Sequence, residues 1–260
     1  MFKINDLVTR NSYNNDVVFK IIEVKDKAYY LKGMNIRLYA DSDESDLVLY
    51  KKEKIVDDEL LIERVDDEIN MDRNDFFYLP GKILHIDGDK EYLERCLSLY
   101  KKYNVLAYGI HEKEEMVPIN IKKYLEEINP DIVIITGHDA YYQKKGDLED
   151  LKAYKNTQNF VKAVVEARKY EKAHDKLIII AGACASCYEA LIKNGANFAS
   201  SPKRINIHAL DPAIVALKIS LTDKTKDIDL INILDKTKYG KDSIGGLITK
   251  GTMYVGYPRV

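Results

Sequence analysis

The stretch that most restricts how this chain can fold is residues 177–187, which read LIIIAGACASC. An apolar, partly β-branched run that ends in small residues is typical of a buried parallel strand. Ser186 and Glu189 then have the Ser-x-x-Glu spacing of a capping box, which predicts that a helix begins directly after the strand. Cys184 is therefore expected just before a helix N-terminus, where the helix dipole favours a thiolate.

A second stretch, residues 131–139, has the same character and reads DIVIITGHD. Its apolar run again predicts a buried strand, and this strand is followed by His138. In a parallel α/β sheet the carboxyl ends of the strands lie at one edge, which is where ligands bind. We therefore expect His138 and Cys184 to face each other at this edge.

The rest of the C-terminal part alternates between strand-like and helix-like segments. Further strands are predicted at 82–87, 105–110 and 204–210, and helices at 91–100, 121–128, 150–170 and from Asp211 onward. Strands that alternate with helices of this length form a parallel sheet covered by helices on both faces. Two glycine-containing runs, 245–249 and 251–256, predict a late hairpin.

The N-terminal part has a different pattern. Turn residues separate short β-prone runs at 7–9, 17–24, 28–32 and 36–39. Closely spaced strands of this kind are typical of a small SH3-like barrel or meander. We therefore predict a small SH3-like β domain at residues 1–50, an acidic linker at 51–75 and an α/β domain at 76–260. A peptide-binding module and a structural docking domain are both compatible with the N-terminal pattern.

Composition limits the classes of partner. The 260 residues include 40 Lys and Arg and 42 Asp and Glu, a formal net charge of −2, so nothing indicates binding to nucleic acid or to a membrane surface. No apolar run approaches the roughly 20 residues of a spanning helix, and the N-terminus lacks the apolar region of a signal peptide. A cytoplasmic location is expected. Three cysteines, an odd number, argue against a disulfide framework.

The residue pattern allows four interpretations of Cys184. In the first, Cys184 and His138 form a dyad in which a thiolate attacks a carbonyl and the histidine protonates the leaving amine. Their separation is close to the roughly 50 residues between histidine and cysteine in caspases. The second is a redox pair with Cys187 in a C-x-x-C motif, and the third is a metal half-site with Cys96 and scattered histidines. In the fourth, both cysteines are small buried apolar side chains. The pattern favours the dyad and leaves the other three open.

A family resemblance adds to this interpretation. It is carried by residues 4–10, 80–89, 135–141, 181–184 and 195–212, which spread over nearly the whole chain. These stretches resemble the YabG family, the sporulation-specific cysteine peptidases of endospore-forming bacteria. The resemblance implies a caspase-like α/β peptidase fold, a catalytic pair of Cys184 and His138, cleavage after Arg and self-processing. It also implies spore coat and cortex-lytic precursor proteins as substrates in the mother-cell cytoplasm, with the spore coat as a second location. We expect no cofactor or metal. A non-catalytic sporulation scaffold that uses the N-terminal β domain stays open as an alternative function.

Further site residues are expected around this pair. The backbone N–H of Cys184 is the expected oxyanion donor, and Gly137 is the candidate for the second. An Arg side chain in a pocket needs a carboxylate, and Asp87 and Asp211 both lie at predicted strand ends. The family pattern has His where this chain has Cys187, so Cys187 is not expected to be essential.

Overall fold

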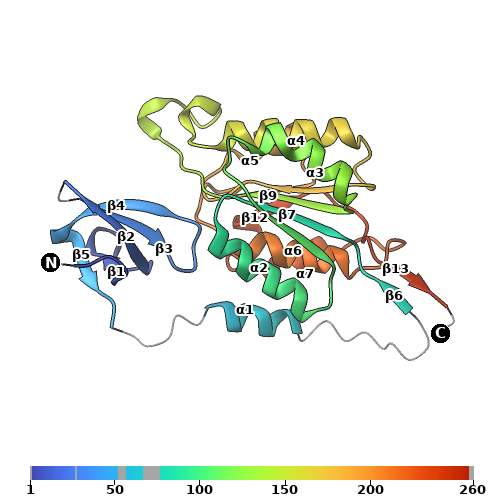
Figure 1. The fold of residues 1–260 in the computed structure, drawn as a ribbon, viewed down its shortest axis with the longest axis horizontal. Helices are drawn as coiled ribbons and strands as arrows, with labels where there is room; N and C mark the ends of the chain where they lie inside the picture. Colours follow the sequence, from blue (N-terminus) through green and yellow to red (C-terminus); the bar gives the residue numbers. More distant parts are fainter. Residues whose placement is uncertain (1, 27, 52–56, 67–76, 258–260) are drawn as a thin grey trace.

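The centre of the fold is a six-stranded sheet (Figure 1). The computed structural model of the chain describes residues 2–26, 28–51, 57–66 and 77–257. The strands of this sheet are β7 (Ile83–Asp87), β8 (Ala107–His111), β9 (Ile132–Thr136), β10 (Ile178–Ala181), β11 (Phe198–Ser200) and β12 (Ile244–Gly246). Their order is β12-β11-β10-β9-β7-β8, and only β12 pairs antiparallel. The predicted mostly parallel sheet is confirmed.

Helices cover both faces of this sheet (Figure 1). One face carries α2 (Lys90–Lys102), α6 (Asp211–Ser220) and α7 (Leu230–Asp235), and the other α3 (Val117–Ile128), α4 (Thr157–Tyr170) and α5 (Tyr188–Lys193). Strand residues alternate between the two cores, since Ile132 and Ile134 lie in one and Val133 and Ile135 in the other. The apolar strands are therefore buried on both sides, which explains their continuous apolar runs.

The N-terminal part forms a separate antiparallel sheet with the order β4-β3-β2-β1-β5. Its strands are β1 (Leu7–Arg10), β2 (Phe19–Lys25), β3 (Ala28–Gly33), β4 (Tyr39–Asp43) and β5 (Leu47–Leu49). Val8, Phe19, Ile21 and Leu31 are buried in its core. The domain boundaries themselves stay a prediction.

Part of the expected linker is helical. Helix α1 (Asp57–Asp66) buries Leu61 and Val65 in the core that also holds residues of α2. Arg95 of α2 donates to both carboxylate oxygens of Asp58. The stretch 57–66 is therefore attached to the α/β core, while the rest of the linker at 52–56 and 67–75 lies outside the described residues.

Short elements complete the described chain. They are the 3₁₀ turns Asn11–Tyr13, Glu44–Asp46, Gln143–Lys145, Leu151–Ala153 and Gly240–Asp242, and a two-stranded sheet of β6 (Phe77–Leu79) and β13 (Tyr254–Gly256). None of the described helices has the length and apolar character that crossing a membrane requires.

Three predicted elements are wrong. The strand expected at 204–210 is absent, because Ser201 and Arg204 have positive φ and only His208 makes a bridge, to Ile36. The fifth parallel strand is β11 instead. The two late runs do not form a hairpin together, since β12 pairs with β11 and β13 pairs with β6.

The helix expected at 150–170 begins only at Thr157. The residues before it are held by other contacts: Tyr141 and Tyr154 form an antiparallel bridge, and the N–H of Asn156 donates to Asp139 at 2.7 Å. Because these backbone groups are engaged outside a helix, the apolar periodicity of α4 cannot extend toward residue 150.

Candidate active site

The candidate site lies where the strand order of the sheet reverses, between β7 and β9. Open parallel sheets bind ligands at such a switch point, beyond the carboxyl ends of the strands. Asp87 is the last residue of β7, His138 follows β9 by two residues, and Cys184 follows β10 by three. The structure therefore brings the predicted residues to one edge of the sheet.

His138 is held in one orientation. Its Nε2 lies 3.0 Å from Oδ2 of Asp89, and its backbone N–H donates to Oε1 of Glu114 at 2.8 Å. An ionised carboxylate can only accept, so Nε2 carries a proton in this pair. Nδ1 of His138 is buried and has no hydrogen-bond partner in the described part of the chain. In the neutral ring this nitrogen has a free lone pair that can take a proton.

Asp89 has several further partners. It is the N-cap of α2, where it accepts from the N–H groups of Glu91 and Tyr92, and Nζ of Lys32 lies 2.8 Å from Oδ2. Burial alone would raise the pKa of the Asp89 carboxyl, but hydrogen bonds from His138 and Lys32 together hold it below its ordinary value. Asp89 is therefore an ionised partner for the imidazole.

Cys184 is fully buried. Within the described residues the hydrogen bonds of its sulfur go to Ile207 rather than to His138: the N–H of Ile207 donates at 3.3 Å. Burial raises the pKa of the Cys184 thiol to about 12, although the Ile207 hydrogen bond works against this shift. Burial at this position therefore favours the thiol over the expected thiolate.

The expected capping box is also wrong. Helix α5 begins at Tyr188 with Cys187 as its N-cap, and no side chain caps it. Ser186 Oγ instead accepts from the N–H of Ala183 and donates to Oδ2 of Asp139 at 2.8 Å. A six-residue helix that begins four residues after Cys184 provides little dipole for its sulfur.

The loops that carry Cys184 and His138 are nevertheless linked. Asp139, next to His138, accepts from Ser186 and from Thr157. Ser186, two residues after Cys184, is thus bound to the residue that follows His138. The two predicted catalytic side chains therefore border one region without a direct hydrogen bond between them.

The two predicted carboxylates have different partners. Asp87 is fully buried, and its Oδ2 lies 2.7 Å from Nη1 of Arg37, which is also fully buried. Burial opposes ionisation of Asp87, but the Arg37 charge keeps the pKa of its carboxyl below the ordinary value. Asp211 instead accepts from the backbone N–H groups of His208 and Lys238, and burial raises the pKa of Asp211 to about 6.

Gly137 makes room for Glu114. A Cβ on Gly137 would lie 2.5 Å from Oε1 of Glu114, and one on Gly88 would lie 2.3 Å from the same atom. The glycines that follow β9 and β7 thus let the Glu114 carboxylate come close enough to the backbone to accept the N–H of His138. The role of the Gly137 N–H as an oxyanion donor stays a prediction.

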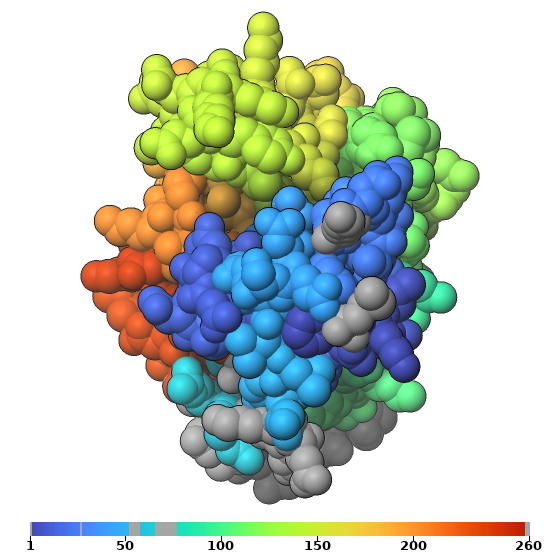
Figure 2. Space-filling model, turned by 90° about the vertical axis from the view of Figure 1, so that its left-hand side faces the viewer, coloured from blue at the N-terminus to red at the C-terminus, as the bar shows by residue number. Residues whose placement is uncertain are grey.

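The N-terminal sheet covers this edge. The ring of Tyr39 lies 4.0 Å from the His138 ring, and Lys32 and Arg37 bind Asp89 and Asp87. Cys184 lies in the same apolar cluster as the core of the N-terminal sheet. Figure 2 shows residues 1–50 across the centre of this face of the molecule.

Four further residues of the site, Asp89, Glu114, Tyr39 and Arg37, were not predicted from the sequence. Asp89 has a local signal, because an Asp between a strand and a helix is a common N-cap. The other three reach the site from segments distant in the sequence, and no local pattern marks them.

Cys187 has different surroundings from Cys184. Its sulfur donates to the carbonyl of Leu148 at 3.6 Å, and it packs with Ala153 and Tyr154 rather than with the N-terminal sheet. It lines a pocket of about 730 Å³ together with Glu189 and Arg204. Both cysteines are free, and their sulfurs have different hydrogen-bond partners: Ile207 for Cys184 and Leu148 for Cys187.

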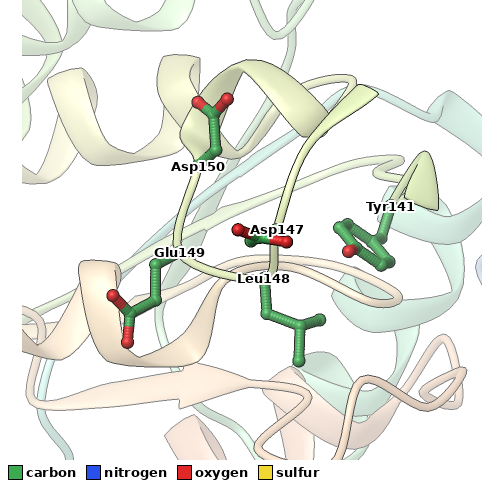
Figure 3. A pocket seen from close by; sticks show the side chains of 5 residues that line it. All are labelled: Tyr141, Asp147, Leu148, Glu149 and Asp150. Carbon is green, nitrogen blue, oxygen red and sulfur yellow. The ribbon is translucent and has the colours of Figure 1, made fainter. Parts of the chain in front are cut away.

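A second pocket has a volume of about 510 Å³, and Figure 3 shows the side chains that line it. It is lined by Tyr141 and by residues 147–150 of the loop between β9 and α4, and Leu148 and Glu149 border both pockets. Neither pocket includes Cys184 or His138. Both are therefore separate from the candidate active site.

Comparison with known proteins identifies the family. A family 3 carbohydrate esterase from Clostridium thermocellum aligns with 44% of this chain and 66% of its own at 12% identity, but the TM-score of 0.27 is too low to support an argument about the fold. The model of the YabG peptidase U57 family matches residues 3–71 and 62–258. The sporulation-specific protease YabG of Bacillus subtilis (strain 168) is 41% identical over 284 residues, covering 99% of this chain and 98% of the relative. On this evidence the chain belongs to the YabG peptidase family.

Proposed function

We propose that this protein is a sporulation-specific cysteine endopeptidase with Cys184 as nucleophile and His138 as general base and acid. One observation carries the proposal: Nε2 of His138 is bound to Asp89, while its Nδ1 is buried and lacks a hydrogen-bond partner among the described residues. This is the arrangement of a base whose other nitrogen is oriented by a third group.

The proposed reaction has two steps. His138 takes the proton of Cys184, and the sulfur attacks the substrate carbonyl carbon while the backbone N–H groups of Cys184 and Gly137 bind the oxyanion. His138 then protonates the leaving amine, and water hydrolyses the thioester. Because Cys184 is fully buried beneath the N-terminal sheet, a substrate reaches it only after that sheet has moved.

We also propose that the α/β part is caspase-like and the N-terminal sheet SH3-like. Support comes from strands β7 to β11, whose order is 2-1-3-4-5, and from the placement of His138 and Cys184 after neighbouring strands β9 and β10. The five antiparallel strands within residues 7–49 support a compact β domain at 1–50, joined by 51–75 to an α/β domain at 76–260.

The specificity that we propose is cleavage after Arg. Asp87 is the favoured acceptor because it already binds a guanidinium at 2.7 Å, whereas Asp211 is occupied by two backbone N–H groups. The name of the Bacillus subtilis relative supports a role in sporulation. We propose spore coat and cortex-lytic precursor proteins as substrates in the mother-cell cytoplasm, together with self-processing.

Three variants test the dyad. Cys184→Ala and His138→Ala should each lower kcat/KM on an Arg-containing peptide by at least about 10³-fold, because each removes one half of the acyl-transfer step. Cys187→Ala is the matched control and should keep most activity. Full activity in Cys184→Ala would overturn the proposal, and loss in both cysteine variants would favour a redox pair.

A further inference from the structure

Arg37 lies in the loop between β3 and β4 of the N-terminal sheet, yet its guanidinium is buried against residues of the α/β part. Nη1 donates to Asp87 at 2.7 Å, and Nη2 donates to the carbonyl of Ala209 at 2.8 Å. The guanidinium carbon lies 5.1 Å from the centre of the Tyr92 ring. A buried Arg is costly unless its charge and its N–H groups have partners, and here an acidic, hydrogen-bonding pocket supplies them.

The backbone around Arg37 is bound like an added strand. The N–H of Arg37 donates to the carbonyl of Ile207 at 3.2 Å, and the N–H of Ala209 donates to the carbonyl of Asn35 at 3.1 Å. Ile36 and His208 form the antiparallel bridge between these two hydrogen bonds. Extended peptides are recognised in this way, with backbone hydrogen bonds for affinity and side-chain pockets for specificity.

This segment also passes both proposed catalytic side chains. Ile207, whose carbonyl accepts from Arg37, donates its own N–H to the sulfur of Cys184 at 3.3 Å. Two residues beyond Arg37, the ring of Tyr39 lies against His138 at 4.0 Å. The chain from Asn35 to Tyr39 therefore follows the path that a substrate needs.

We propose that Asp87, the Ala209 carbonyl and the Tyr92 ring form the subsite for the Arg side chain of a peptide substrate, and that Asn35–Arg37 occupies this subsite as an internal, substrate-like ligand. The proposal rests on the proposed function and deepens it, because it names the pocket and explains why the site is covered. A substrate then competes with Arg37 for the same carboxylate.

Binding without catalysis tests this. In the full-length Cys184→Ala protein, the peptide acetyl-Asn-Ile-Arg-amide should bind weakly because Arg37 fills the pocket. Adding Arg37→Ala should tighten binding by about 100-fold, the scale of one buried charged contact. Citrulline in place of the peptide Arg should remove this gain, since citrulline has the same shape without the charge. Adding Asp87→Asn should remove it as well.

Arg37→Lys is a second variant. It replaces Arg37→Ala if circular dichroism shows that Arg37→Ala is unfolded. Lys keeps the positive charge but lacks the two parallel N–H donors of a guanidinium. The Arg peptide should therefore bind the Arg37→Lys protein about tenfold more tightly than the protein that keeps Arg37. A folded variant that shows no preference for Arg over citrulline would overturn the subsite. The subsite and the dyad fail separately. If the subsite is overturned but cleavage still needs Cys184, the proposed dyad stands. If cleavage occurs without Cys184, the dyad is overturned and the subsite stands.

Discussion

At the scale of single residues, neighbouring groups set the charges at the carboxyl edge. Asp87 and Asp89 are both buried. Arg37, in the loop between β3 and β4, keeps Asp87 ionised, and His138 together with Lys32 of β3 keeps Asp89 ionised. The second oxygen of Asp87 accepts from the N–H of Asp89 at 2.9 Å, so the two carboxylates are held in one turn. Removing one partner of such a buried ion pair lowers the stability of the protein by more than the pair adds to it, because the remaining buried charge has no counter-charge.

Asp89 is expected to control the tautomer of His138. Asp89→Asn should lower kcat on the order of 10²–10⁴-fold with little change in KM, because the amide can donate to Nε2 and move the proton to Nδ1. The matched control is Lys32→Met, which removes an Asp89 partner but keeps its bond to His138. The pH dependence of kcat/KM distinguishes the two roles. If Asp89→Asn and Lys32→Met change the pH profile in the same way, Asp89 has only a structural role.

Asp211 should give a pH dependence to stability. Burial raises the pKa of Asp211 from 3.8 to about 6, so the folded protein binds this proton more tightly than the unfolded chain does. The free energy of unfolding therefore falls as pH rises from about 4 to about 6, by about 3 kcal/mol, and stays lower above that range. Other buried groups titrate in the same range, so the Asp211 contribution is read as a difference: measured by urea unfolding from pH 4 to pH 7, the free energy of unfolding of the wild type should fall by this amount relative to that of Asp211→Asn. Parallel curves for both proteins would contradict it.

At the scale of elements, the turns after β7 and β9 are built to place charged side chains. Gly88 and Gly137 leave space for the carboxylate of Glu114, which fixes the backbone of His138. The turn after β10 works differently, because Ser186 is tied to Asp139 rather than to the helix that follows. The edge is therefore held together by side chains that connect neighbouring turns.

Gly137→Ala should disturb this arrangement without removing the backbone N–H. The added Cβ would lie 2.5 Å from Glu114, so that side chain must move and lose the His138 N–H. We expect kcat to fall about tenfold and the stability by about 1–2 kcal/mol. Gly146→Ala is a matched control. Its added Cβ would lie 2.7 Å from the Asp150 carboxylate, a similar clash that is remote from the candidate active site. Equal activities of the two variants would show that the Glu114 contact has no part in catalysis.

At the scale of the whole molecule, the N-terminal sheet lies over the carboxyl edge of the α/β sheet (Figure 2). It places Tyr39 on His138 and encloses Cys184 in its apolar cluster. The raised pKa of the thiol follows from this cover, because burial is its main cause. An active peptidase with this structure has to separate the cover from the edge.

The cover should protect Cys184 from alkylation. With a pKa of about 12, only about one thiol in 10⁴ is ionised at pH 8, whereas the unfolded chain has an ordinary thiol. Iodoacetamide should therefore modify Cys184 at least about 10³-fold more slowly in the native protein than in urea, as measured by peptide mass spectrometry. Similar rates in both conditions would show that the sheet leaves the thiol accessible.

The α/β class and the edge that carries the site follow from the amino-acid sequence alone. Continuous apolar runs such as 177–181 and 131–135 must be buried on both faces, and the residues that follow them must reach the same edge. These are local consequences of strand and helix periodicity, and they are enough to place Asp87, His138 and Cys184 at the carboxyl ends of their strands.

What these side chains touch depends instead on the tertiary structure. The bond of His138 to Asp89, the burial of Cys184 and the insertion of Arg37 beside Asp87 all join segments from different parts of the chain. The capping box failed because Ser186 is bound to Asp139 of another segment. The strand at 204–210 failed because of positive φ at Arg204 and because Ile207 and Ala209 pair with residues 35–37 instead. Charge state and access depend on burial and on such distant partners, and periodicity contains no information about either.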